Sequence, residues 1–309
     1  MKSRKIEQKS FAQELIISFS KKKKIIPSKF HYDLKGSKYF EKITKTKEYY
    51  VTRVEKEILN KISDQINKFF GNNLTFVEFG SGSAEKIRIL INKKVKFYVP
   101  LDISFDFINE SSKKLLKSFP NLKILPTYCD YTKYISLPKS ISKIKIGFFL
   151  GSSIGNFYNK EEEKFLKNAK KTLGKKSFLF VGVDLIKNVK ILKKAYNDKG
   201  NFTARFNLNL INIINKQVKT KLKVRDFKYI PTFNKKKNSM ENFIESKKDQ
   251  NFFIKKNKFY LKKGDKIQTE ISNKFTISKF TKLAKSSGWS VKKHWKDAKR
   301  YYAVFLLQA

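Results

Sequence analysis

The chain has 309 residues and carries 70 lysines and arginines against 26 aspartates and glutamates, which gives a formal net charge of +44. Hydrophobic residues make up 40% of it, enough to bury a core, and the length suggests one large domain or two intertwined domains. A single cysteine, Cys129, excludes disulfide bonds within the chain, and two histidines without a cysteine–histidine cluster argue against zinc, so we expect no metal.

Lysine supplies nearly all of the positive charge. Arginine, the residue favoured for bidentate contacts to phosphates and bases, is rare in this chain. The lysines are spread along the whole sequence without a dominant block. We interpret the charge as a compositional bias that permits salt-sensitive binding of polyanions, and we expect no specific nucleic-acid partner.

Residues 5–20 show the apolar spacing of a helix. Polar residues interrupt the apolar stretch at 11–19, so the pattern indicates an amphipathic helix rather than a signal peptide or a membrane span. A basic run at 21–24 follows. Together with the lack of disulfides, this predicts a cytoplasmic protein with no membrane partner.

The segment 29–53 is rich in aromatic and polar residues at once. Aromatic side chains three to four residues apart usually form the core of a helical packing. Tyr32, Tyr49 and Tyr50 nevertheless carry hydroxyls that need partners when they are buried. The segment therefore predicts either ordinary packing or one wall of a small polar pocket.

The apolar run 74–79 reads as a buried strand and leads into Gly80-Ser81-Gly82, after which residues 86–92 have a helical pattern. A strand, a glycine turn and a helix form a nucleotide-cofactor cradle, in which the helix start offers free N–H donors. Glu85 stands where a dinucleotide site has its third glycine, and it tolerates a cationic ligand better than a pyrophosphate. Asp102 ends the next strand, the usual place for a carboxylate that binds ribose. This combination resembles S-adenosylmethionine (SAM) methyltransferases.

A helix is expected at 54–70, and helices then alternate with strands, which predicts a parallel sheet. Asp130 and Tyr131 follow the third strand, where an acid and an aromatic residue commonly meet the adenine in this fold class. The stretch 151–156 follows the fourth strand, so it is either placed to touch cofactor and substrate or is a simple turn. The expected strands are 74–79, 97–101, 122–126, 144–150 and 177–183.

The pattern changes after residue 184. Two helices, one around 192–196 and one at 203–215, precede strand-like segments in 220–263 and 267–272. A helix at 274–287 and final strands at 290–291 and 302–307 complete the chain. The predicted fold class is α/β: a Rossmann-like SAM methyltransferase sheet with a second, smaller α+β substrate domain.

A set of ordered motifs resembles the histidine-specific Nα-methyltransferases, SAM-dependent enzymes that form trimethylhistidine (hercynine) on the way to ergothioneine. The resemblance covers about residues 25–309. The motifs are Tyr32-Asp33 through Gly36-Ser37, Glu48-Tyr49-Tyr50-x-Thr52-Arg53, Gly80-Ser81-Gly82 with Glu85-Lys86, Val99-Pro100-x-Asp102, Phe149-Leu150-Gly151-Ser152-x-Ile154-Gly155-Asn156, Asp184-Leu185-x-Lys187, Ala195-Tyr196-x-Asp198, Thr203-Ala204-x-Phe206-Asn207 and Thr269-Glu270-x-Ser272-x-Lys274-Phe275.

The resemblance implies a SAM-binding methyltransferase domain at 54–185 and 275–309, and a substrate-binding domain at 1–53 and 186–274. It implies Tyr32 and Asn156 as catalytic residues and SAM contacts from Gly80, Lys86, Asp102, Asp130 and Tyr131. It implies an amino-acid pocket formed by Tyr32, Phe40, Tyr49, Gly151, Ser153, Asn156, Tyr196, Asn242, Glu270 and Ser272.

Within that pocket, Asn156 would bond the α-carboxylate or the amine, and Tyr196 would donate to the carboxylate. Glu270 would accept from one imidazole nitrogen and Ser272 would bond the other. A tyrosine hydroxyl or bulk water would take the proton of the amine. The expected function is trimethylation of free L-histidine to hercynine by a monomer.

One position departs from the family pattern. Asn242 stands where the family usually has a methionine that packs against the imidazole, unless the local alignment is off by a residue. A polar amide there changes the expected pocket wall. The alternatives are therefore an N-methyltransferase of another amino acid or, from the net charge, an RNA methyltransferase or nucleic-acid-binding protein.

Overall fold

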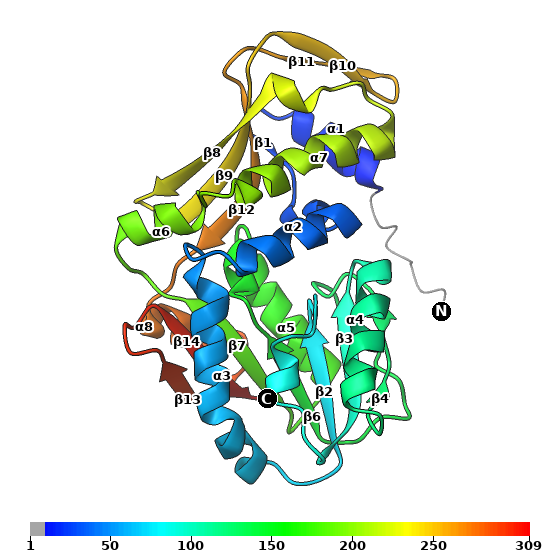
Figure 1. The fold of residues 1–309 in the computed structure, drawn as a ribbon, viewed down its shortest axis with the longest axis vertical. Coiled ribbons are helices and arrows are strands. Elements are labelled where there is room, and N and C mark those ends of the chain that lie inside the picture. Colours follow the sequence, from blue (N-terminus) through cyan, green and yellow to red (C-terminus); the bar gives the residue numbers. More distant parts are fainter. Residues whose placement is uncertain (1–9) are drawn as a thin grey trace.

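The computed structural model describes residues 10–309. These residues form an eight-stranded sheet, a four-stranded sheet and a two-stranded hairpin. In Figure 1 the large sheet and its helices occupy the lower half of the molecule, and the smaller sheet occupies the upper half. The predicted α/β architecture with a second, smaller α+β part is confirmed.

The large sheet has the strand order β13-β14-β7-β6-β2-β3-β4, with β5 also paired to β3. Its central strands are parallel, and β2, β6 and β7 are apolar runs buried on both faces, as parallel strands under helices require. The last two strands extend one edge in antiparallel fashion. The bounds are β2 (Leu74–Phe79), β3 (Val95–Asp102), β4 (Lys123–Ile124), β5 (Thr127–Tyr128), β6 (Lys145–Phe149), β7 (Phe178–Asp184), β13 (Ser290–Lys296) and β14 (Tyr302–Gln308).

Helices cover both faces of this sheet. Phe76 and Val77 are neighbours in β2, and because successive side chains of a strand point to opposite faces they belong to separate apolar clusters. The cluster around Phe76 lies under α3 and α4, and the cluster around Val77 lies under α5 and α8. The bounds are α3 (Tyr50–Phe69), α4 (Phe105–Ser118), α5 (Glu161–Leu173) and α8 (Ile277–Ser286).

The smaller sheet has the order β1-β12-β9-β8. Helices α1 and α7 pack against it through a third apolar cluster that includes Leu15, Leu210 and Ile267. The hairpin of β10 and β11 projects at the top of Figure 1. The bounds are α1 (Phe11–Phe19), β1 (Lys24–Ile25), α7 (Phe202–Val218), β8 (Phe227–Asn234), β9 (Ser239–Ser246), β10 (Gln250–Ile254), β11 (Asn257–Leu261) and β12 (Lys266–Asn273).

Short elements join the two parts. Helix α2 contacts both α7 of the upper part and α3 of the lower part, so it lies at their junction (Figure 1). The 3₁₀ turn η3 packs against both β7 and β12 at the same place. The remaining bounds are η1 (Ser28–His31), α2 (Leu34–Thr44), η2 (Ile87–Ile89), η3 (Ser153–Asn156), α6 (Val189–Ala195) and η4 (Val224–Asp226).

The helix predicted at 86–92 is wrong. Only the single 3₁₀ turn η2 occurs there. The glycine turn is followed by Ala84 with φ of 57°, so the chain does not pass directly from the turn into a helix. Too few residues remain before β3 begins at Val95 for a stable helix. The backbone N–H groups of this turn are therefore not aligned at the start of an α-helix, which differs from the sequence prediction.

Two other boundaries also differ. The strand predicted at 122–126 is replaced by the two-residue strands β4 and β5, because Pro126 between them has no N–H for pairing. The first helix begins at Phe11 after an Ser10–Gln13 capping box, and the rest of the predicted span, 5–9, lies outside the described residues. No helix within residues 10–309 is both long and apolar enough to cross a membrane.

Candidate active site

Two adjoining cavities lie where the large sheet meets the smaller one. The larger has a volume of about 390 Å³ and the smaller about 40 Å³. Five residues line both of them: Tyr32, Phe40, Gly151, Ser153 and Asn156. The two cavities thus adjoin at these residues, so groups held in them would meet there.

The larger cavity contains the glycine turn after β2. Gly80 has φ of +72°, and a Cβ there would lie 3.3 Å from the ring of Tyr131, so the tyrosine closes directly over the turn. Gly82 donates its N–H to Asp102 Oδ2 at 3.1 Å, and Ser104 donates to Oδ1 at 3.0 Å. Burial raises the pKa of Asp102, while these backbone donors lower it. The turn and the end of β3 are therefore joined through one carboxylate.

Acidic residues outnumber basic ones in the wall of the larger cavity, although the whole chain has 26 acidic residues against 70 basic ones. This reversal favours a ligand that carries positive charge. Within residues 10–309, seven acidic residues, Glu14, Glu41, Glu78, Glu85, Asp102, Asp130 and Glu161, line it against five basic ones, Lys29, Lys56, Lys86, Lys133 and Lys164.

Glu78 forms part of the floor of this cavity. It is buried, and it accepts a hydrogen bond of 2.5 Å from the hydroxyl of Tyr98. Burial raises the pKa of Glu78 to about 8, against a smaller lowering by the Tyr98 hydrogen bond. A cationic group beside it would compensate the cost of ionising this carboxyl, so the floor also fits a positively charged ligand.

Glu55 of α3 lies behind the shared wall of the two cavities and contacts residues that line them. Its buried carboxylate accepts from the N–H of Gly151 at 2.9 Å and from the hydroxyl of Tyr302 at 2.6 Å. It also forms an ion pair of 2.7 Å with Lys86, which lines the larger cavity. The sequence motifs did not single out Glu55, because it is distant from Lys86, Gly151 and Tyr302 along the chain.

Replacing Gly151 with alanine is expected to reduce activity by about tenfold or more, because a small misplacement at the junction of the cavities disturbs the approach of the reacting groups. Gly151 has φ of +78°, and a Cβ there would lie 2.8 Å from the Nζ of Lys86. The left-handed backbone adds a stability cost of about 1–2 kcal/mol. Steady-state kinetics and thermal unfolding measure both effects.

The matched control is Gly71→Ala, because a Cβ at Gly71 meets no atom within 4 Å. This variant should behave as the parent protein does. Equal activity of Gly151→Ala and Gly71→Ala would show that the shape of the turn at residue 151 does not matter for the reaction.

Aromatic side chains form one wall of the smaller cavity. The ring of Phe40 lies 5.9 Å from that of Tyr32 and 5.9 Å from that of Phe206, between their centroids. Burial raises the pKa values of Tyr32 and Tyr49 well above their ordinary range, and Glu270 raises that of Tyr32 further. Both phenols are therefore neutral hydrogen-bonding groups at physiological pH.

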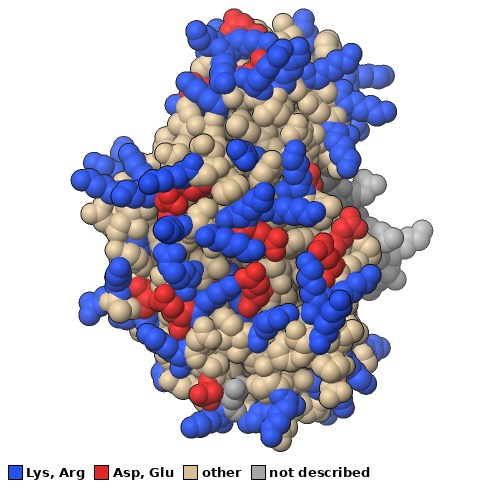
Figure 2. All heavy atoms as spheres, viewed as in Figure 1, with Lys and Arg blue, Asp and Glu red and all other residues tan. Residues whose placement is uncertain are grey.

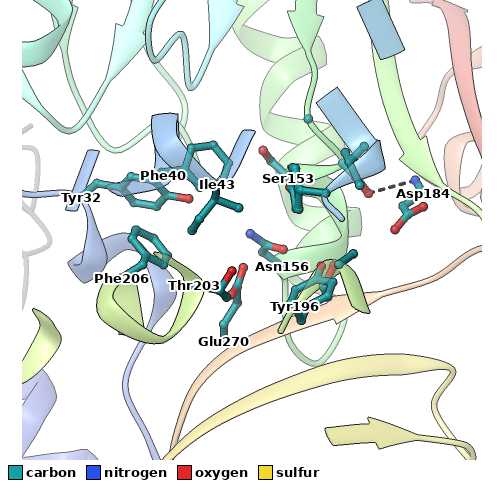
Figure 3. A pocket seen from close by; sticks show the side chains of 16 residues that line it. Tyr32, Phe40, Ile43, Ser153, Asn156, Asp184, Tyr196, Thr203, Phe206 and Glu270 are labelled. Atoms are coloured by element: carbon teal, nitrogen blue, oxygen red, sulfur yellow. Dashed lines mark hydrogen bonds between the residues drawn. The ribbon is translucent and has the colours of Figure 1, made fainter. Parts of the chain in front are cut away.

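Polar side chains from separate elements point into the smaller cavity. Figure 3 shows the Tyr32 hydroxyl, the Asn156 amide and the Glu270 carboxylate turned toward one space. Within residues 10–309 the amide of Asn156 has no hydrogen-bond partner, and the buried Oγ1 of Thr203 has none either. The Thr203 hydroxyl is buried and the Asn156 amide is half-buried, and two such polar groups without partners in one cavity indicate a polar ligand that would complete them.

A β-bulge places Glu270 in the cavity. The register between β12 and β9 shifts between Gln268 and Glu270, so Thr269 has no cross-strand partner. Glu270 then lies opposite Asn242, which donates its amide N–H to Glu270 Oε2 at 2.7 Å. Burial raises the pKa of Glu270 to about 7, opposed by the hydrogen bond from Asn242 and by the charge of Lys274.

Asn242 lies behind the cavity instead of forming its wall, which differs from the expectation for this position. It is buried, and its Oδ1 accepts from the hydroxyl of Tyr229 at 2.9 Å. The amide therefore orients the Glu270 carboxylate rather than touching the contents of the cavity.

A buried charge cluster backs the opposite side. Asp184 forms ion pairs of 2.5 Å with Lys187 and 2.7 Å with Lys274. Tyr50 donates to Asp184 at 2.8 Å, so its hydroxyl serves this cluster and not the pocket. The two lysines lower the pKa of Asp184 even though burial opposes them. Burial lowers the pKa of Lys187 to about 8.

The structure brings the sequence-predicted residues together in two groups. The five expected cofactor residues all line the larger cavity: Gly80, Lys86, Asp102, Asp130 and Tyr131. Nine of the ten expected substrate residues line the smaller one: Tyr32, Phe40, Tyr49, Gly151, Ser153, Asn156, Tyr196, Glu270 and Ser272. Thr203, Phe206 and Asp184 also line the smaller cavity; the motifs contained them, but no role had been assigned to them. Within residues 10–309 no cluster of histidine, cysteine and carboxylate side chains is suited to a metal ion.

The chain is similar in sequence to known proteins over most of its length. The sequence profile of a family described as "Histidine-specific methyltransferase, SAM-dependent" matches residues 11–309. The chain is 28% identical over 259 residues to the histidine N-alpha-methyltransferase of Mycolicibacterium smegmatis, covering 82% of this chain and 80% of that protein. It is 24% identical over 311 residues to an N-methyltransferase of Aspergillus flavus, covering 96% of this chain and 84% of the relative.

Two further similarities extend this comparison. The chain is 33% identical over 196 residues to ergothioneine biosynthesis protein 1 of Neurospora crassa, covering 60% of this chain and 22% of that longer protein. The crystal structure of magnesium protoporphyrin IX methyltransferase from Synechocystis with bound S-adenosylhomocysteine superimposes with a TM-score of 0.51 at 9% identity, covering 89% of this chain and 95% of that one. At that identity the structural likeness shows a shared fold.

Proposed function

The chain belongs to the family of histidine-specific, SAM-dependent methyltransferases, and from this premise we propose that it methylates the α-amine of free L-histidine to the trimethylated product, hercynine. When bound, SAM would supply an electrophilic methyl group: the amine nitrogen would form a bond to that carbon while the C–S bond breaks, and S-adenosylhomocysteine would be the leaving group. The residues of the larger cavity fit such a ligand, because its wall has a glycine turn, a carboxylate at the end of β3 and an excess of acidic groups.

The observation that carries the proposal is the pair formed by Glu270 and Ser272 in the smaller cavity. Residues two apart in a strand share a face, so β12 presents a carboxylate and a hydroxyl side by side. An imidazole offers one N–H donor and one acceptor nitrogen. The two groups therefore match the two ring nitrogens of histidine, and an apolar side chain would leave them unpaired.

The α-amine would lie at the shared wall of the two cavities. Tyr32 and Asn156 line both cavities, and the Asn156 amide offers a donor and an acceptor to the backbone groups of an amino acid. Because burial raises the pKa of Tyr32, its phenol keeps its own proton and orients the amine through its oxygen instead of acting as the base. The amine proton then leaves to water. Orientation of the neutral amine is the main contribution of the chain, as in other reactions accelerated by proximity.

A mass-spectrometric assay tests the proposal. Purified protein is incubated with SAM and an equimolar mixture of the standard amino acids. We expect histidine alone to gain the mass of three methylenes, with intermediates that carry one and two. A gain that stops at one methylene would contradict trimethylation, and a gain on a different amino acid would contradict the choice of substrate.

The second candidate is an N-methyltransferase of another amino acid. The arrangement behind Glu270 favours it, since an amide and not a thioether lies at position 242. The same assay separates the two candidates. A nucleic-acid substrate has less support, because the lysines in Figure 2 are scattered over the visible face without one basic patch.

We further propose the domain division that the sequence predicts, with SAM binding in 54–185 and 275–309 and substrate binding in 1–53 and 186–274. The two separate sheets support this division. We also propose that the protein is monomeric and cytoplasmic. Size-exclusion chromatography with light scattering measures its molar mass in solution and so tests the oligomeric state.

A further inference from the structure

Lys274 is a buried cation directly behind the smaller cavity. It is 1% exposed, and its ammonium has three polar neighbours. Nζ lies 2.7 Å from Asp184 Oδ2, 2.7 Å from the Oγ of Ser272 and 3.1 Å from the hydroxyl of Tyr196. An ammonium has three N–H donors and no acceptor, so each donor of Lys274 has a partner.

This arrangement constrains the two hydroxyls. A hydroxyl has one proton, and because Lys274 only donates, Ser272 and Tyr196 must accept from it and direct their own protons elsewhere. Both residues line the smaller cavity. This wall is therefore a hydrogen-bond donor.

The neighbouring group on β12 has the opposite character. Asn242 donates to Oε2 of Glu270, which leaves Oε1 as the acceptor that faces the cavity. Glu270, Ser272 and Lys274 follow one another at a spacing of two residues, the spacing of one strand face. The cavity thus offers an acceptor at Glu270 and a donor at Ser272 and Tyr196.

We propose that Lys274 is a positioning residue that fixes Ser272 and Tyr196 as hydrogen-bond donors, so that the site selects a ligand with an acceptor nitrogen opposite them and an N–H opposite Glu270. The proposal rests on the proposed function and refines it. The form of histidine that satisfies both walls is the neutral imidazole in a single tautomer, because an imidazolium has two N–H groups and no acceptor.

Lys187 provides a matched control. It is also buried and also paired with Asp184, but its other donors go to the hydroxyl of Tyr50 at 2.7 Å and to the carbonyl of Leu185 at 2.5 Å. It makes no hydrogen bond to Ser272 or Tyr196. Replacing either lysine with methionine leaves Asp184 with one cationic partner, so the two variants differ mainly in whether the cavity hydroxyls lose their donor.

The experiment compares the parent protein, Lys274→Met and Lys187→Met. Titration calorimetry with S-adenosylhomocysteine present measures binding of L-histidine and of a pyrrolyl-alanine in which a C–H replaces the acceptor nitrogen. We expect the parent to prefer histidine by about tenfold or more. Lys274→Met should lose most of that preference, and Lys187→Met should keep it. Methyl-transfer kinetics on both ligands give a second readout.

Equal preference for histidine in all three proteins would overturn the proposal, even if both variants bind more weakly. If Lys274→Met does not fold, as thermal unfolding would show, Ser272→Ala tests the same donor wall: it should also lose the preference, and a retained preference would again overturn the inference. A parent protein that neither binds nor methylates histidine would instead refute the proposed function. The two failures are therefore distinguishable.

Discussion

Replacing Glu270 with glutamine is expected to lower kcat/KM for histidine by about a hundredfold or more, because a site that is built around a buried hydrogen bond loses most of its selectivity when the acceptor changes. The carboxylate lies in the smaller cavity and shares its strand face with Ser272. Glutamine keeps the size of the side chain but removes its charge. Steady-state methyl transfer to histidine measures the effect.

The same substitution should stabilise the ligand-free protein above neutral pH. The folded pKa of Glu270 is raised from 4.5 to about 7, so the folded state holds its proton more tightly than the unfolded state does. The parent protein therefore loses stability as the pH rises from 4.5 to about 7. Glutamine does not ionise, so the variant gains on the order of 2–3 kcal/mol above pH 7 and nothing below pH 4.5.

Chemical unfolding at several pH values checks this second effect. The control is Glu245→Gln, because Glu245 lies on the neighbouring strand β9 and forms ion pairs with Lys228 and Lys266 away from both cavities. The control should retain methyl transfer. If Glu270→Gln methylates histidine as fast as the control does, Glu270 does not bind the imidazole.

Replacing Asp102 with alanine is expected to weaken SAM binding by about 10²-fold to 10⁴-fold. We expect the carboxylate to accept hydrogen bonds from both ribose hydroxyls, and each charge-assisted bond contributes about 1.5–3 kcal/mol. The substitution also removes the acceptor of the Gly82 N–H, so the glycine turn loses a contact. Titration calorimetry with S-adenosylhomocysteine measures the loss directly.

The matched control is Asp106→Ala, which removes an exposed carboxylate in the first turn of α4. It changes the net charge by the same amount and does not touch the larger cavity. Unchanged affinity in Asp102→Ala would show that the ligand of the larger cavity does not use the end of β3.

The local patterns predicted the large sheet well. The strand predicted at 74–79 agrees with β2, and the expected ends of the other long strands of the large sheet lie within a few residues of the observed ones, because parallel strands covered by helices are continuous apolar runs. The same reasoning failed at 86–92, where an apolar spacing typical of a helix occurs in a segment that is too short to form one. The spacing of apolar residues does not show how many residues are available for a helix between the end of β2 and the start of β3.

The motifs also contained most of the predicted residues that line the two cavities, because a resemblance to a family assigns roles to individual positions of the sequence. They did not find Glu55, which holds Gly151, Lys86 and Tyr302. A buried glutamate in an amphipathic helix has no sequence signal of its own. Its partners come from distant parts of the chain, and only the packed helix shows that they meet.

The sequence alone determined the alternation of the long strands with helices, the glycine turn with Asp102 and the acid and hydroxyl at positions 270 and 272, because each depends on neighbours along the chain. The tertiary structure decided which way the hydrogen bonds of the site point. Asp184 and Lys274 lie ninety residues apart in the sequence and 2.7 Å apart in the fold, where water is excluded. Because water is excluded, each N–H of the Lys274 ammonium needs an acceptor in the protein, and this requirement makes Ser272 and Tyr196 accept from Lys274 and donate toward the cavity.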